Sequence, residues 1–96
     1  MMIVEEMKKL RGYLDEHKIP WTDASSQGCS FWMCRTHFIL KRNHWSVING
    51  YGSYGGIDTF SLKNGGLLEL MTSEVNGGEP VGHLTADEVI RYMEEK

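Results

Sequence analysis

The feature that most constrains this sequence is a pair of strand-like segments separated by a short polar stretch. Residues 30–40, SFWMCRTHFIL, are rich in aromatic and branched side chains, and residues 44–49, HWSVIN, share this character. Such segments are typical of β-strands, and the intervening KRNH predicts a tight turn. We therefore predict an antiparallel hairpin. With the turn centred on Arg42 and Asn43, the expected pairs are Leu40 with Trp45, Phe38 with Val47, and Thr36 with Asn49.

The two faces of this hairpin differ, because successive side chains of a strand point to opposite sides of a sheet. The paired residues, together with Trp32 and Cys34, form a face that we expect to lie in the core. The opposite face mixes apolar and ionisable side chains, namely Arg35, His37, Ile39, Ser46 and Ile48. A shift of the turn by one residue would change which side chains meet.

The rest of the chain predicts an α+β fold, with a small antiparallel sheet between an N-terminal and a C-terminal helix. Apolar residues recur at helical spacing over residues 3–17, with charged residues such as Arg11 between them. Residues 23–28 indicate a loop or a weak edge strand, 67–71 a strand or a short helix, and 80–84 an extended piece. Thr85 and Glu88 have the spacing of a capping box before the last helix. We expect residues 1–96 to form a single domain.

Composition and charge restrict the classes of partner. The net charge of −3 argues against binding of bulk nucleic acid, which requires a basic surface. No apolar run approaches the length of a membrane span, and the N-terminal residues lack the apolar region of a signal peptide. We therefore expect a protein of the cytoplasm that does not bind membranes and whose cysteines stay reduced.

The cysteines and histidines do not have the spacing of a metal site. Cys29, Cys34, His37 and His44 give C-x4-C-x2-H-x6-H, whereas zinc signatures use closer cysteine and histidine pairs. Cys34 and His37 also point to opposite faces of an extended strand, which disfavours a catalytic thiol–imidazole pair as well. We expect no metal and no cofactor.

The stretch NGYGSYGG, residues 49–56, follows the second strand and is half glycine. Its G-x-G-x-x-G lacks the following helix of a dinucleotide fingerprint. Loop glycines can nevertheless bring backbone N–H groups close to anionic oxygens, and tyrosines can stack on a planar base. Arg35, which opposes Gly50 in the expected pairing, can hold a phosphate. The predicted ligand site comprises Arg35, His37, Asn49, Gly50, Tyr51, Gly52, Ser53, Tyr54 and Gly55. The alternative is that the glycines only make turns while the tyrosines pack on the sheet.

Four segments carry a resemblance to known proteins: CRTHF at residues 34–38, WSVINGYGSYGG at 45–56, GLLELM at 66–71 and VGHLTADEV at 81–89. In overall pattern the chain resembles small proteins encoded in phages and prophages of Gram-positive bacteria. This resemblance implies a phage context, in which small accessory proteins often counteract host defence. It assigns no role to any residue.

Three functions follow as hypotheses. The first is a non-catalytic sponge that sequesters a nucleotide-like immune signal, of the cyclic-nucleotide or ADP-ribose type, in a pocket that a second subunit of a homo-oligomer can complete. The second is a protein-binding inhibitor of an immune effector, similar to anti-CRISPR factors. The third is a small nucleotide-processing enzyme that uses His37, His44, His83 or Asp58 as acid–base groups.

Overall fold

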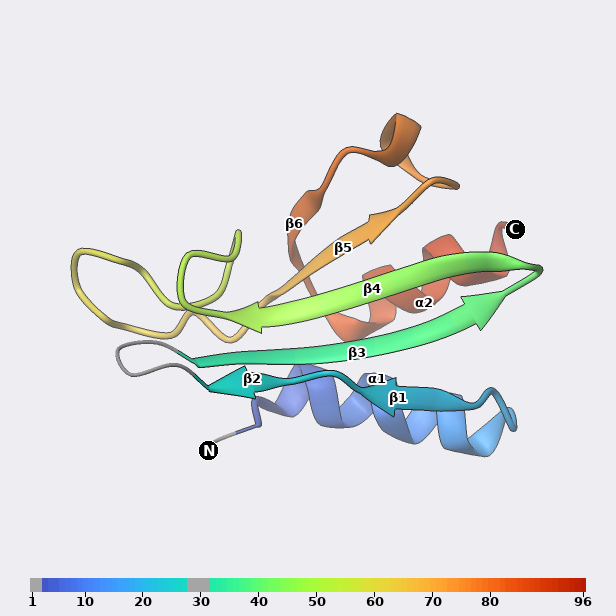
Figure 1. Cartoon of the computed structure of the whole chain (residues 1–96), viewed down its shortest axis with the longest axis horizontal. Coiled ribbons are helices and arrows are strands. Elements are labelled where there is room, and N and C mark those ends of the chain that lie inside the picture. Colours follow the sequence, from blue (N-terminus) through green and yellow to red (C-terminus); the bar gives the residue numbers. More distant parts are fainter. Residues whose placement is uncertain (1–2, 28–31) are drawn as a thin grey trace.

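The computed structural model describes residues 3–27 and 32–96, which form an antiparallel sheet with two helices on one of its faces (Figure 1). The predicted α+β class is confirmed. In chain order the elements are α1 (Glu5–Glu16), β1 (Trp21–Asp23), β2 (Ser26–Gln27), β3 (Trp32–Leu40), β4 (Asn43–Gly50), β5 (Leu68–Thr72), the short 3-10 turn η1 (Asn76–Gly78), β6 (Val81–Leu84) and α2 (Ala86–Glu94).

The strands follow the order β1-β3-β4-β5-β6, and β2 also pairs with β3. All of these pairs are antiparallel. The segment predicted as a loop or weak edge strand, residues 23–28, contains β2 and the last residue of β1 at the edge of the sheet, while β1 itself begins at Trp21. The segment at 67–71, for which both a strand and a helix were open, is the strand β5.

The predicted pairing of the central hairpin is wrong by two residues. Phe38 pairs with Trp45 and Leu40 with Asn43, because the turn residues are Lys41 and Arg42. Both have positive φ, 50° and 73°, as a two-residue turn with the twist of the strands requires. Since the shift is an even number of residues, every side chain keeps its predicted face.

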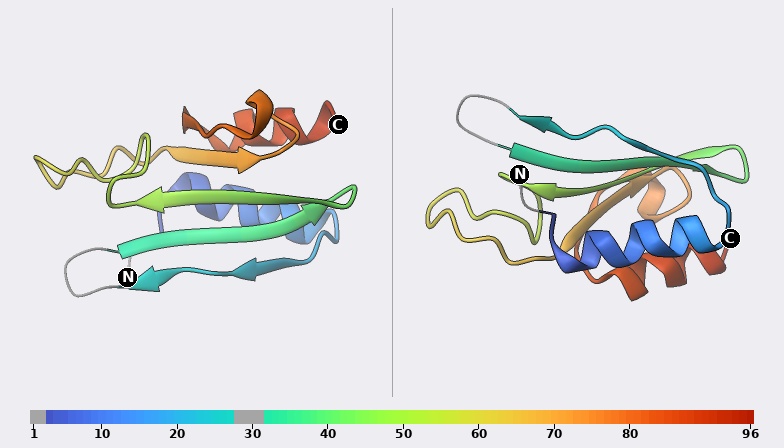
Figure 2. Two further views of the ribbon diagram at one scale, coloured as in Figure 1. Left: turned by 45° about the horizontal axis from the view of Figure 1, so that its top comes forward. Right: turned by 90° about the horizontal axis from the view of Figure 1, so that it is seen from below.

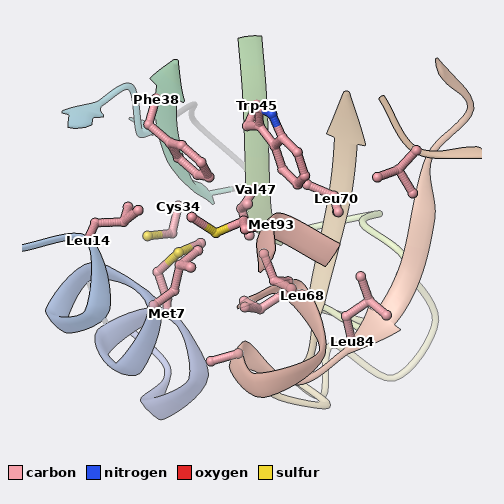
Figure 3. Close-up of a cluster of buried hydrophobic side chains, with 14 residues drawn as sticks. Met7, Leu14, Cys34, Phe38, Trp45, Val47, Leu68, Leu70, Leu84 and Met93 are labelled. Atoms are coloured by element: carbon pink, nitrogen blue, oxygen red, sulfur yellow. The ribbon is translucent and has the colours of Figure 1, made fainter. Parts of the chain in front are cut away.

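The helices α1 and α2 lie side by side on one face of the sheet, as both views of Figure 2 show. Their apolar side chains point toward the helix-facing side of β3, β4 and β5, where Cys34, Val47 and Trp45 are fully buried. Figure 3 shows this core, including Met7, Leu14 and Met93 from the helices. The core face predicted from alternation in the hairpin is therefore confirmed.

Side-chain caps and contacts fix how α2 begins. The hydroxyl of Thr85 accepts from the Glu88 amide, and the Glu88 carboxylate accepts from the Thr85 amide at 3.0 Å, which confirms the predicted capping box. The Ala86 amide donates to the Glu6 carboxylate of α1 at 2.7 Å. The start of α2 is thereby joined directly to α1.

One charged residue of α1 is not where its helical pattern placed it. Arg11 was expected on the polar side of the helix, but it is buried, with 8% of its surface exposed. Its guanidinium donates to the hydroxyl of Thr36 at 2.8 Å and lies 4.6 Å from the centre of the Trp21 ring. Arg11 is thus part of the contact between α1 and the β1–β3 edge of the sheet.

Candidate functional site

The sheet face opposite the helices, here called the open face, carries the ionisable side chains of the central hairpin. Cross-strand pairing places Arg35 beside Ile48 and His37 beside Ser46. The next strand adds Met71 beside Ser46. Apart from Glu69 and Gly50, the open-face residues of β3, β4 and β5 are partly or fully exposed. Polar side chains of β3 and β4 thus converge on this face.

A groove of about 570 Å³ lies on the open face, where β4 begins and β5 ends, and we call it the basic groove. Its basic side chains are Arg42, His37 and His44. No aspartate or glutamate is among its described lining residues, although the whole chain has a net charge of −3. The remaining lining residues are Asn43, Trp45, Ser46, Met71, Thr72, Ser73 and Gly78.

The titratable side chains of the open face influence one another. Partial burial, followed by the nearby charges of Arg35 and His44, lowers the pKa of His37 below its ordinary value of 6.5. The Nε atom of Arg35 is buried and has no hydrogen-bond partner among the described residues.

A second groove of about 430 Å³ lies on the other side of His37 and His44, and we call it the apolar groove. Its apolar side chains are Pro20, just before β1, and Ile39 of β3, while the ring of Trp21 itself faces α1, where its Nε1 donates to Asp15 at 2.9 Å. Thr22 and Phe38 complete the lining. The two histidines therefore border both grooves.

The glycine-rich loop does not offer its amides to a ligand in the way that its composition indicated. Gly52 donates to Ile57 O at 3.1 Å, and Gly56 donates to Ser53 O at 3.0 Å. The Gly50 amide donates to the hydroxyl of Ser53 at 3.0 Å. The Tyr54 amide donates to the Glu69 carboxylate, also at 3.0 Å. These donors already have partners within the fold, so the predicted anion-binding role of these N–H groups is not supported.

Close backbone packing explains why this loop is rich in glycine. A Cβ atom on Gly50 would lie 2.5 Å from Trp32 O and 2.7 Å from the Cα atom of Met33. A Cβ atom on Gly56 would collide with the Ser53 hydroxyl and would lie 2.6 Å from Gly50 O. Both positions require glycine for steric reasons.

Asn49 lies on the helix-facing side of β4, where its side chain is hydrogen-bonded within the fold. It is fully buried and donates to Leu67 O at 2.8 Å, and its amide exchanges hydrogen bonds with the Asn64 amide. These bonds tie the segment that precedes β5 to the end of β4. Asn49 lies on the opposite side of the sheet from Arg35 and His37.

The loop does form one wall of a third hollow, of about 430 Å³, which we call the loop pocket. Lys63 and His83 face it from neighbouring segments, and Asp58 lines it. The carboxylate of Asp58 is engaged by the Phe60 amide and the Ser61 hydroxyl, both at 2.9 Å, and these bonds lower its pKa. The remaining lining residues are Ser53, Tyr54, Gly55, Gly56, Gly65 and Leu67.

The structure therefore divides the predicted ligand residues among separate places. Arg35 and His37 lie on the open face, and Asn49 lies in the core. Ser53, Tyr54 and Gly55 line the loop pocket, while Gly50, Tyr51 and Gly52 belong to the hydrogen-bonded loop. The expected opposition of Arg35 and Gly50 does not occur, because Arg35 pairs with Ile48 and Gly50 pairs with Met33.

Sequence reasoning did not assign Arg42, Ser46 and Ser73 to a ligand site. Ser46 could have been included, since alternation places it on the face that carries His37. Arg42 could not have been included, because its direction toward β5 depends on the turn being at Lys41 and Arg42. Ser73 reaches the groove through the β4–β5 pairing, which no local pattern indicated.

The side chains considered for metal binding or thiol chemistry are also separated. Cys34 is buried on the helix-facing side, whereas His37 and His44 lie on the open face. Cys29 lies outside the described residues. Within residues 3–27 and 32–96, no group of three or more His, Cys, Asp and Glu side chains is placed to hold a metal ion.

Comparisons of the chain with protein-family models, with curated proteins and with solved structures gave no match. In the described part of the chain, neither helix has the length and apolar character needed to span a membrane.

His37 gives the fold a specific pH dependence. Its pKa is lower in the folded chain than in the unfolded one, so the unfolded chain binds more protons below about pH 6.5. The free energy of unfolding should therefore fall as the pH drops through 6.5 toward the folded pKa. His37→Gln should make this loss smaller when urea unfolding is compared at about pH 7.5 and 5.5. An unchanged pH dependence in the variant would contradict the assignment.

Proposed function

We propose that this chain is a non-catalytic binding protein for a small nucleotide-derived anion and that the basic groove is its binding site. The observation that carries the proposal is the composition of the groove. Arg42, His37 and His44 line it without a carboxylate among its described residues, in a chain whose overall charge is negative. Such a lining favours phosphate over neutral or cationic ligands.

The groove also offers the other groups that a nucleotide requires. Arg42 and the imidazole of His44 can donate to phosphate oxygens. Ser46 and Ser73 supply hydroxyl groups for the sugar, and Met71, 47% exposed, supplies an apolar surface for a base. Arg35 lies in β3 on the same face as His37. It adds positive charge near the groove but does not line it.

The arrangement of Ser46 and His37 favours ligand binding without catalysis. Ser46 is the cross-strand neighbour of His37. No hydrogen bond joins these two side chains among the described residues, whereas an activated serine contacts its base. Together with the phage resemblance, this favours sequestration of an immune signal in the cytoplasm of the infected bacterium, of the cyclic-nucleotide or ADP-ribose type.

The test is native mass spectrometry of the protein after exposure to cyclic dinucleotides, cyclic oligonucleotides and ADP-ribose derivatives. We expect one of these to be captured with an unchanged mass. Arg42→Ala should weaken its binding about 10- to 100-fold, the range for loss of a charged hydrogen bond. Arg35→Ala should weaken it less.

Lys63→Ala, in the loop pocket, is the matched control because it removes one positive charge outside the basic groove. It should leave the affinity within about twofold. Loss of binding in Lys63→Ala but not in Arg42→Ala would place the ligand in the loop pocket instead. Capture of no nucleotide by the wild-type protein would reject the proposal.

The exposure of Ile39, 57%, and Met71 on the open face favours a second candidate, a protein-binding inhibitor of an immune effector. Exposed apolar side chains of this kind can anchor a protein partner. This candidate predicts that a purified effector binds the wild-type protein and that Ile39→Lys and Met71→Lys each abolish the complex. Retention of the complex in both variants would reject it.

A further inference from the structure

Strand pairing joins the basic groove and the apolar groove into one continuous strip across the open face. Side chains of directly paired residues point to the same side of a sheet. Thr22 pairs with His37, and His37 pairs with Ser46. Ser46 pairs in turn with Met71. These pairs form a row of four side chains that crosses β1, β3, β4 and β5.

A second row lies beside the first, two residues closer to the turn between β3 and β4. Ile39 pairs with His44 in this row. Continuing the same registers places Pro20 beside Ile39 and Ser73 beside His44. Neighbouring strands lie about 4.8 Å apart, so each row is about 14 Å long. The apolar groove takes the β1 end of both rows, the basic groove takes the β5 end, and the two histidines lie between them.

The position of His44 between the grooves decides where a bound phosphate can lead. An imidazole keeps one N–H donor even when it is neutral, so His44 can donate to a phosphate oxygen in the basic groove. Because His44 also lines the apolar groove, a second group esterified to the same phosphate can extend into the apolar groove. No aspartate or glutamate is among the described lining residues of either groove, so no carboxylate of the lining repels that phosphate.

The apolar groove offers the contacts that a second nucleoside requires. Pro20 and Ile39, which is 57% exposed, provide an apolar surface for a base, and Thr22 provides a hydroxyl group for a sugar. The groove has a volume of about 430 Å³, compared with about 570 Å³ for the basic groove. Both volumes lie within the range of about 300–1,000 Å³ that is usual for small-molecule sites. Each groove can therefore hold one nucleoside unit.

We propose that the ligand is a dinucleotide, with one nucleoside in the basic groove, the second in the apolar groove and the linking phosphate beside His37 and His44. This inference rests on the proposed function and narrows its ligand to two nucleosides joined through phosphate. Cyclic dinucleotides and nucleosides joined through a diphosphate share this chemistry. Once the first nucleoside is bound, binding of the second is intramolecular, which raises the affinity of the linked ligand above that of either half.

Titration calorimetry of the wild-type protein compares mononucleotides with two-nucleoside ligands of the same base. The probes are AMP and GMP, cyclic di-AMP and cyclic di-GMP, and the diadenosine and diguanosine diphosphates. For one base, a two-nucleoside ligand should bind about 100-fold more tightly than the mononucleotide. The cyclic and diphosphate probes distinguish the two kinds of linkage. Arg42→Ala should weaken both classes of ligand, because both place a phosphate in the basic groove.

Ile39→Ser tests the apolar groove separately. It should lower the affinity for the two-nucleoside ligand about 10-fold and leave the affinity for the mononucleotide within about twofold. Leu62→Ser is the matched control, because Leu62 is a 67% exposed aliphatic residue that lines neither groove. It should change neither affinity. Circular dichroism of each variant confirms that it is folded.

The outcomes separate this inference from the proposed function. If a mononucleotide binds within about threefold of the two-nucleoside ligands and Arg42→Ala weakens it, the dinucleotide is rejected and the proposed function stands. Full affinity of Ile39→Ser for the two-nucleoside ligand would also reject the dinucleotide. If none of these probes binds, the dinucleotide is rejected, whereas capture of another nucleotide in native mass spectrometry would still support the proposed function.

Discussion

Replacing Arg11 by alanine is expected to lower the free energy of unfolding by about 3 kcal/mol, because the substitution leaves both a cavity and unpaired buried groups. The guanidinium donates to Thr36 at 2.8 Å, to Arg35 O at 3.4 Å and toward the buried Cys34 sulfur at 3.5 Å. It also stacks on Trp21. Its ion pair with Asp23, at 3.4 Å, adds little, since the Asp23 side chain is 52% exposed.

Urea unfolding followed by tryptophan fluorescence measures this effect. Lys8→Ala is the matched control, because Lys8 lies on the same helix with its side chain 59% exposed, and it should change the free energy by less than about 0.5 kcal/mol. Arg11→Met, which keeps most of the apolar volume, should recover part of the loss. A loss below about 1 kcal/mol in Arg11→Ala would show that Arg11 does not hold α1 on the sheet.

The second large effect is expected from Gly56→Ala, which should destabilise the fold by about 2 kcal/mol, the range for overpacking a tight site. The added methyl group would meet the Ser53 hydroxyl and, at 2.6 and 2.8 Å, the backbone O and N of Gly50. Because these are mostly backbone atoms, the turn itself must open. The hydrogen bonds that join residues 50–57 would then be strained.

The same chemical change at Gly12 should have the opposite sign. Gly12 lies in α1, and a Cβ atom there has no neighbour within 4 Å, so Gly12→Ala should stabilise the protein by about 1 kcal/mol. Thermal unfolding of both variants gives the comparison. Equal small effects in the two variants would mean that the glycine-rich loop is not tightly packed. Retention of nucleotide binding in Gly56→Ala would further separate this loop from the ligand site.

Local patterns predicted the elements of this fold well. Helical spacing identified α1, the Thr85–Glu88 motif located the start of α2, and alternation sorted the hairpin side chains into a core face and a mixed face. These features depend on residues that are close in sequence. The hairpin register was less well predicted, because its turn uses Lys41 and Arg42 in a conformation that favours glycine or asparagine.

The candidate site was predicted only in part. The predicted mixed face with Arg35 and His37 lies opposite the helices, where both side chains are partly exposed. The glycine-rich loop, in contrast, packs onto β6 and its neighbouring segments, where the Tyr54 carbonyl accepts from the His83 amide. No pattern within the loop reveals that contact, since its partner is distant in the chain.

The sequence by itself determined the α+β class, the helix boundaries to within a few residues and the faces of the central strands, because these follow from local periodicity and capping. Only the tertiary structure decided that Arg11 is buried, that Asn49 and Arg35 lie on opposite sides of the sheet, and that Arg42 joins His37 and His44 around one groove. These outcomes depend on strand order and on the contact of α1 with the sheet. Both arise from burial of apolar surface shared by residues far apart in the chain.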